Sequence, residues 1–306
     1  MIRFTQSCRE RKTLPAIPNR RGSNMGDGNW IVENLRNALA MWNAKLTEIW
    51  ALMSQSPDEF KGGAVWDVMV NINDALKAIG YGLLVLFFVM GVMKTAGSFA
   101  ELKRPEHAFK VFIRFALAEA AITFCMDILL MLFRIAQGAI SVIMSSSGIM
   151  LSAATDLPQE VITAITNVGF WDSIPLWIVT LLGSLIIWVL SLVMILTVYG
   201  RFFKIFMATA IAPIPLASFA GEPTANIGKS FIKTYAALCL QGCVIVLACV
   251  IFSVVASEEP TLGNVAGMSA VTITWQYIGE LLFNMLVLVG TIKTSDRLIR
   301  ELMGLS

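Results

Sequence analysis

The stretch from residue 173 to 200 contains no charged side chain, and this feature constrains the fold of the chain more than any other. A helix that crosses a bilayer needs about 20 mostly apolar residues. Four further runs meet this requirement, at about 75–97, 111–133, 234–256 and 270–292. The composition agrees, because 57% of the residues are apolar and only 14% are charged, against roughly 45–50% and roughly 25% in soluble domains. We therefore predict an all-α, polytopic membrane helix bundle over residues 75–292, with about five transmembrane helices.

The segments between these spans differ in charge, and the difference predicts the orientation of the chain. Lys and Arg near the ends of spans stay on the cytoplasmic side. Segments 134–172 and 257–269 carry more acidic than basic residues, so we expect them outside, with the amino terminus outside and the tail 293–306 in the cytoplasm. The basic residues assigned to cytoplasmic loops are Lys94, Lys103, Arg104, Lys110 and Arg114 between the first and second spans, and Arg201, Lys204, Lys229 and Lys233 between the third and fourth; Lys293, Arg297 and Arg300 follow the fifth span.

One further apolar segment, 203–220, lies between basic residues on both sides. Pro213 and Pro215 each remove an amide donor and break a helix there after about two or three turns. We therefore expect this segment to re-enter the membrane or to lie at its cytoplasmic face, since broken helices at membrane depth need protein or water around their freed backbone groups. The alternative is a sixth span with a proline kink, which would place the carboxyl terminus outside.

Residues 25–74 form an amphipathic region before the first span. Apolar side chains fall within one arc of a helix over residues 31–53, which predicts an amphipathic helix. We expect this helix outside the cytoplasm, either in the outer headgroup layer, with Trp30, Trp42 and Trp50 as interfacial anchors, or packed on another subunit. The residues of the apolar arc are Ile31, Leu35, Ala38, Leu39, Trp42, Leu46, Ile49 and Met53.

Residues 1–24 conflict with an external amino terminus, because six basic residues face the single acid Glu10. Such a segment stays inside, and no apolar core of a signal peptide follows it. We therefore hypothesise that the true start is Met25, with Arg20 and Arg21 encoded by a ribosome-binding sequence. The alternative is a disordered basic tail.

Ionisable and polar residues within the fifth span and around the second are candidates for function, because a charge at bilayer depth is costly. They could line a polar path, or they could pair and fasten helices or subunits together, and we consider fastening the better supported of the two. The candidates are Arg114, Glu119, Asp127, Arg134, Glu280 and Asn284.

Catalytic chemistry is not expected. The chain has one histidine and five scattered cysteines, which do not supply a metal site or a disulfide framework. It also lacks the nucleotide-binding, zinc-protease and hydrolase signatures. We therefore predict that the chain is not an enzyme and binds no cofactor, so that any energy comes from another subunit.

The segments 67–130 and 201–242, and above all YGRFFKIFMATAIAPIPLASF, carry a family resemblance. Together with the order of the spans, they make the chain similar to the TrbL-like polytopic membrane subunits of conjugative type IV secretion systems, in particular those on integrative elements of Gram-positive bacteria.

The resemblance implies a channel or scaffold subunit in the bacterial cytoplasmic membrane, which helps to translocate relaxase-bound single-stranded DNA. It also implies a homo-oligomer that works beside other secretion subunits and ATPases. The alternative function is a secondary transporter, because a broken helix places half-helix ends at a substrate site in such proteins.

Overall fold

The computed structural model describes residues 30–96, 105–146, 155–166, 173–257 and 269–305, and every regular element in these ranges is helical. The predicted residues 1–24 and Met25 lie outside the described residues, as do Lys103 and Arg104. The elements are α1 (Trp30–Ser54), η1 (Phe60–Gly63), α2 (Ala64–Ala96), α4 (Pro105–Thr123), α5 (Cys125–Ser146), α6 (Gln159–Thr166), α7 (Ser173–Ile211), α8 (Pro213–Ala217), η2 (Ser218–Ala220), α9 (Ala225–Ser257) and α10 (Ala270–Leu302).

Five helices in the described ranges are long and apolar enough to cross a bilayer, and the prediction of an all-α polytopic bundle is confirmed. These candidate spans are Phe60–Lys94, Cys125–Ser146, Ile174–Ile211, Ala225–Ala256 and Val271–Leu302. The second begins later than the predicted 111–133, because the helix is interrupted at Phe124, between α4 and α5, although backbone hydrogen bonds continue through that residue. The apolar window therefore belongs to α5 rather than to α4.

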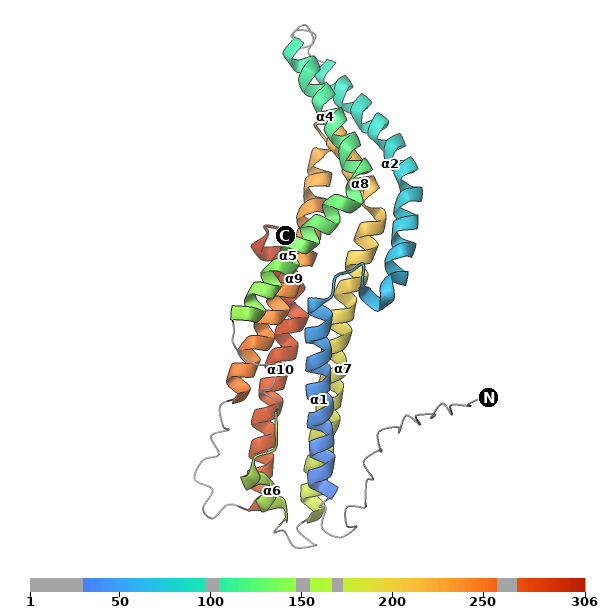
Figure 1. The fold of residues 1–306 in the computed structure, drawn as a ribbon. Helices are drawn as coiled ribbons and strands as arrows, with labels where there is room; N and C mark the ends of the chain where they lie inside the picture. Colours follow the sequence, from blue (N-terminus) through green and yellow to red (C-terminus); the bar gives the residue numbers. More distant parts are fainter. Residues whose placement is uncertain (1–29, 97–104, 147–154, 167–172, 258–268, 306) are drawn as a thin grey trace, which may run out of the picture.

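The helices form an elongated molecule with two hydrophobic cores (Figure 1). The first core joins α1, α7, α9 and α10, which run side by side through the lower half of the view. The second joins α2, α4, α5, α8 and the first part of α9 in the upper half. The α2–α4 pair extends beyond the ends of α1 and α10 to form the narrow upper end of the molecule.

Helix α1 is amphipathic as predicted, but it lies in neither of the two predicted places. Its apolar arc is buried against α7 of the same chain, with Leu35 and Trp42 completely covered. The packing of aromatic side chains explains this position, because Trp30 contacts Trp177 at 5.6 Å between ring centroids and Phe60 stacks on Phe202 at 4.7 Å. The periodicity predicted the buried face of α1 but not its partner.

The segment predicted to re-enter, 203–220, is divided between two elements. Helix α7 continues unbroken to Ile211, and its 39 residues correspond to about 58 Å. Pro213 begins the short helix α8 directly after Ala212, as expected of a residue that has no amide proton to donate. The helix break therefore lies where the prolines predicted it. Whether this part of the chain re-enters the membrane stays a prediction.

Helix α2 packs closely on this break. A Cβ atom added at Gly80 would lie 3.0 Å from the carbonyl oxygen of Pro213, and one at Gly91 would lie 3.2 Å from the Cα of Gly221. The two glycines let the backbone of α2 approach α8 and the turn after it. The same α2 backbone has open space at Gly82, so the close approach is confined to one face of the helix.

Candidate functional site: a polar layer across α7, α9 and α10

Arg201 of α7 is the largest charged side chain buried in the described part of the chain, with only 1% of its surface exposed. Its Nε donates to the carbonyl oxygen of Leu238 at 3.1 Å, and its Nη2 donates to that of Cys239 at 3.0 Å. Its Nη1 lies 3.5 Å from the sulfur of Met53 on α1. One guanidinium group thus joins α7 to the backbone of α9 and to α1.

The surroundings of Arg201 are shaped to admit a guanidinium. The rings of Phe133 and Phe202 lie 5.8 and 5.5 Å from its central carbon, within the range of cation–π attraction. A Cβ atom at Gly242 would lie 2.8 Å from Nη2 and 2.8 Å from Cδ1 of Ile140. Gly242 therefore leaves the space that gives Arg201 access to the carbonyl oxygens of α9.

Arg201 has no ion-pair partner among the described residues. A buried charge is costly unless polar groups replace the lost water. Here two carbonyl oxygens, a thioether and two ring faces replace it. Each of these carbonyl oxygens has two lone pairs, so it can accept a hydrogen bond from Arg201 in addition to the backbone hydrogen bond within α9.

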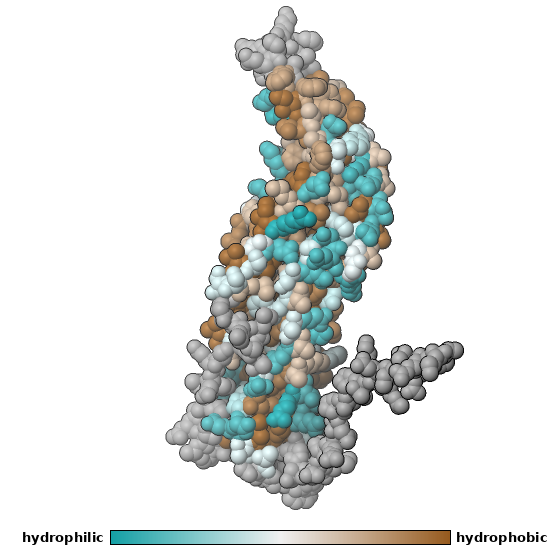
Figure 2. Space-filling view, viewed as in Figure 1, coloured by the Kyte–Doolittle hydropathy of each residue, from teal (hydrophilic) through white to brown (hydrophobic). Residues whose placement is uncertain are grey.

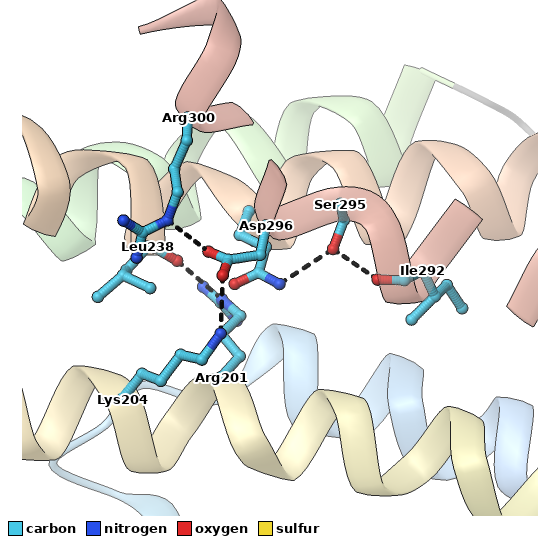
Figure 3. A network of polar contacts seen from close by, with 8 residues as sticks. Arg201, Lys204, Leu238, Ile292, Ser295, Asp296 and Arg300 are labelled. Carbon is cyan, nitrogen blue, oxygen red and sulfur yellow. Dashed lines mark hydrogen bonds and ion pairs between the residues drawn. The ribbon is translucent and has the colours of Figure 1, made fainter. Parts of the chain in front are cut away.

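Close to Arg201 in the same layer, Asp296 of α10 is paired with two other cations (Figure 3). Lys204 lies 2.8 Å from one of its oxygens and Arg300 lies 3.2 Å from the other. The Lys204 pair joins α7 to α10 at the level of Arg201, while the Arg300 pair lies within α10.

A third contact completes the layer between α9 and α10. The amide nitrogen of the buried Gln241 donates to Oγ of Ser295 at 3.0 Å, and that hydroxyl donates to the carbonyl oxygen of Ile292 at 2.7 Å. The other amide atom, Oε1 of Gln241, has no hydrogen-bond partner among the described residues. We call the set Arg201, Lys204, Gln241, Ser295, Asp296 and Arg300 the polar layer.

A separate buried network joins α2 to α5, α7 and α9 farther along the molecule. Nδ2 of Asn73 donates to the carbonyl oxygen of Thr209 at 2.7 Å, and its Oδ1 accepts from Sγ of Cys125 at 3.1 Å. The hydroxyl of Thr209 lies 3.3 Å from that of Tyr235. This network fixes the α2 end of the molecule to α7 just before the helix break.

The polar layer binds helices α7, α9 and α10 together. In the ranges that the structure describes, no group of three or more His, Cys, Asp or Glu side chains lies close enough to hold a metal ion. The polar layer holds its charges in hydrogen bonds and ion pairs rather than presenting them to a cavity. We call this set of contacts between α7, α9 and α10 the clamp, because its hydrogen bonds and ion pair hold the three helices together.

The predicted charges in and around the second and fifth spans are not brought together. Glu119, Asp127 and Arg134 are exposed, and none of them makes a side-chain hydrogen bond or ion pair with another described residue. Glu280 and Asn284 are half-buried on α10. The predicted choice between a polar path and a fastening role stays open for these five residues.

Arg114 is the exception, because it joins two separate segments. Its Nη2 lies 3.3 Å from Oε1 of Glu222, which follows η2 in the chain. This ion pair fastens α4 to the turn before α9, with a partner that the sequence analysis did not name.

The predicted cytoplasmic basic loop after the third span is corrected by the structure. Arg201 and Lys204 lie within α7, not in a loop, and Arg201 is buried, because apolar residues on both sides of it extend the helix to Ile211. Lys110, Lys229 and Lys233 are exposed, as expected of residues at an aqueous or headgroup surface. Pro213 is buried and Pro215 is half-buried at the helix break.

Sequence reasoning missed Gln241, Ser295 and Asn73. A usable signal existed for Arg201 alone, since it stands among apolar and aromatic residues in YGRFFKIFMATAIAP. An arginine in such a run must find partners inside the protein, but which carbonyl oxygens it binds depends on where α9 packs.

Comparisons with known proteins give one match. No curated protein and no solved structure matches the chain. A family model described as "TrbL/VirB6 plasmid conjugal transfer like protein" matches residues 42–213, which include the second half of α1, all of α2 to α7 and the helix break at Pro213. This range is more than half of the chain. The chain therefore belongs to the TrbL/VirB6 plasmid conjugal transfer-like family, as the resemblance predicted, and is a multi-pass membrane component of a conjugal transfer system.

Proposed function

We propose that this chain is a channel or scaffold subunit of a conjugative type IV secretion system in the bacterial cytoplasmic membrane. In this proposal it does not act as an enzyme but helps relaxase-bound single-stranded DNA to cross the membrane. The observation that carries the proposal is the family match over residues 42–213. The polar layer supports it, because a path between helices needs a frame that keeps its shape while other subunits supply the energy.

The proposal includes a homo-oligomer that assembles with other secretion subunits and ATPases. Many exposed side chains on the candidate spans are large and apolar, among them Leu182, Ile186 and Val189 of α7. Lipid or further protein must cover such surfaces. We further propose that the amino-terminal side of the bundle lies outside and the carboxyl terminus inside, since Lys293, Arg297 and Arg300 lie together near the end of α10.

A deletion of the gene tests the function. The deletion should abolish transfer of the mobile element while growth and small-solute uptake remain normal, and the wild-type gene supplied in trans should restore transfer. Formaldehyde cross-linking during transfer, followed by capture of a tagged chain, should then recover the transferred strand and not unlinked DNA of the donor. Normal transfer after deletion would refute the proposal.

A secondary transporter is the second candidate, and the helix break between Ile211 and Pro213 is the observation that favours it. Against it, the residues around the break pack tightly on Gly80 and Gly91 of α2, which leaves little room for a substrate there. Loss of uptake of one solute after deletion, with transfer intact, would favour this candidate.

A further inference from the structure

Helix α1 lies at the depth of the most apolar window of α7, although it is not itself a candidate span. The rings of Trp30 and Trp177 are 5.6 Å apart. Farther along the same two helices, the hydroxyl of Tyr199 donates to Oε1 of Glu48 at 3.1 Å. Residues 30–48 therefore run parallel to residues 177–199, which lie within the candidate span Ile174–Ile211. If α7 crosses the membrane here, α1 crosses beside it (Figure 1).

The outward face of α1 is polar or small along its whole length. Its exposed residues recur every three or four positions, which places them on one side of the helix. From residue 33 to residue 54 this side extends over about 32 Å, close to the roughly 30 Å of a bilayer's hydrocarbon core. We call it the α1 stripe; its residues are Glu33, Arg36, Asn37, Ala40, Ala44, Thr47, Ala51 and Ser54.

The neighbouring face of α7 has the opposite character. Its exposed residues at the same depth are large and apolar, including Ile186, Val189 and Leu196. In α1, all of which the structure describes, Trp30 at the first position is the single exposed large apolar side chain. Figure 2 shows teal and pale residues over the front of the lower half, where Figure 1 places α1, beside brown ones. Lipid suits the α7 face, whereas charged and amide groups at bilayer depth need water or protein.

A groove runs along the edge of the stripe. It has a volume of about 420 Å³ and lies between α1 and α7. Its α1 wall is formed by Asn34, Asn37, Ala38 and Met41, and its α7 wall by Leu181, Ser184, Leu185 and Trp188. The hydroxyl oxygen of Ser184 is buried in this wall and has no hydrogen-bond partner among the described residues. This hydroxyl places a polar group in the wall between the two helices, beside the amide side chains of α1.

We propose that the α1 stripe lines a water-filled path through the membrane. The inference rests on the proposed channel function and deepens it by assigning the lining to one helix. In this arrangement α1, α5, α7, α9 and α10 are the helices that cross side by side. Helix α1 contributes the polar wall that none of the five apolar windows provides.

Cysteine labelling tests this assignment in cells that carry the complete transfer system. Asn37→Cys, Ala40→Cys and Thr47→Cys place thiols on the stripe. Ile186→Cys, Val189→Cys and Leu196→Cys are matched controls on α7, because the Trp30–Trp177 and Glu48–Tyr199 contacts enclose both sets at the same depths. A membrane-impermeant thiol reagent is applied to intact cells and to inverted vesicles, with the wild-type chain as the blank.

Thiols react as thiolates, which form in water and not in lipid. We expect the stripe positions to react about tenfold faster than the α7 positions from at least one side of the membrane. Equal rates for the two sets, or no reaction of the stripe from either side, would overturn the inference and would mean that lipid or protein covers α1. Ala44→Cys, a change of one sulfur atom on an exposed alanine, gives the same readout if another variant does not accumulate.

Failure of this inference and failure of the proposed function give different results. If the stripe is labelled but transfer is normal after deletion of the gene, α1 lines a water-filled path and the protein has another function. Loss of transfer after deletion together with an unreactive stripe would keep the secretion role and remove α1 from the path.

Discussion

Replacing Gly242 with alanine tests the geometry of the polar layer most directly. The added methyl carbon would lie 2.8 Å from Nη2 of Arg201 and 2.8 Å from Cδ1 of Ile140, so both side chains must move. Overpacking of this kind costs about 1–3 kcal/mol. Displacing the guanidinium also weakens its bond to Cys239, and hydrogen bonds to charged groups contribute about 1.5–3 kcal/mol.

A matched control separates this effect from the general effect of removing a glycine. Gly279 of α10 is also within a helix, but a Cβ atom there meets nothing within 4 Å. Gly279→Ala should gain up to about 1 kcal/mol from helix propensity. We therefore expect Gly242→Ala to be less stable than Gly279→Ala by about 3–4 kcal/mol, which corresponds to roughly 6–12 °C in unfolding midpoint.

The assay is thermal unfolding of the purified variants in one detergent, followed by a double-mutant cycle. With Arg201→Met, a flexible side chain replaces the guanidinium, so Gly242→Ala should cost about 1–2 kcal/mol less in that background. Equal unfolding temperatures for Gly242→Ala and Gly279→Ala would show that Arg201 does not lie against the backbone of α9. The clamp would then be refuted.

Three further predictions concern other contacts and use the same unfolding assay. Gly80→Ala should lower the unfolding midpoint, because its Cβ would lie only 3.0 Å from Pro213. Gly82→Ala, on the open side of α2, should leave the midpoint unchanged or raise it. A lower midpoint for Gly82→Ala than for Gly80→Ala would contradict the packing of α2 on α8. Asn73→Ala removes buried hydrogen bonds to α7 and α5 and should cost about 2–3 kcal/mol, and a loss within error would show that this network is not formed. Asp296→Asn weakens two partly exposed ion pairs and should cost only about 1 kcal/mol, with a loss that shrinks at high salt; a loss that salt does not change would exclude an electrostatic origin.

Features set by local sequence could be predicted. The apolar runs gave an all-helical membrane bundle because length and hydropathy act within one segment. The arc that includes Leu35, Leu39 and Trp42 predicted the buried face of α1 because helical periodicity is fixed by the backbone. Pro213 marked the helix break for a similar reason, since a missing amide donor acts at its own position.

Features set by partners could not be predicted. Arg201 looked like a loop residue because nothing in its own segment reveals the carbonyl oxygens of Leu238 and Cys239, 37 and 38 positions away. The place of α1 beside α7 depends on contacts such as Trp30–Trp177, which no single-segment pattern contains. The second candidate span starts at Cys125 because the helix is interrupted at Phe124, a point without Pro or Gly to signal it, although backbone hydrogen bonds continue through that residue.

The unbroken length of α7 has a mechanical consequence. A rod of 39 residues that is fastened near Arg201 behaves as a lever with a long arm toward Ser173 and a short arm toward Ile211. Tilting it by about 5° about that pivot would move the far end of the long arm by about 4 Å and the short end by about 1 Å, at 1.5 Å per residue. Motion imposed by a neighbouring subunit at the Ser173 end would therefore arrive at the Ile211 end reversed in direction and reduced to about a third.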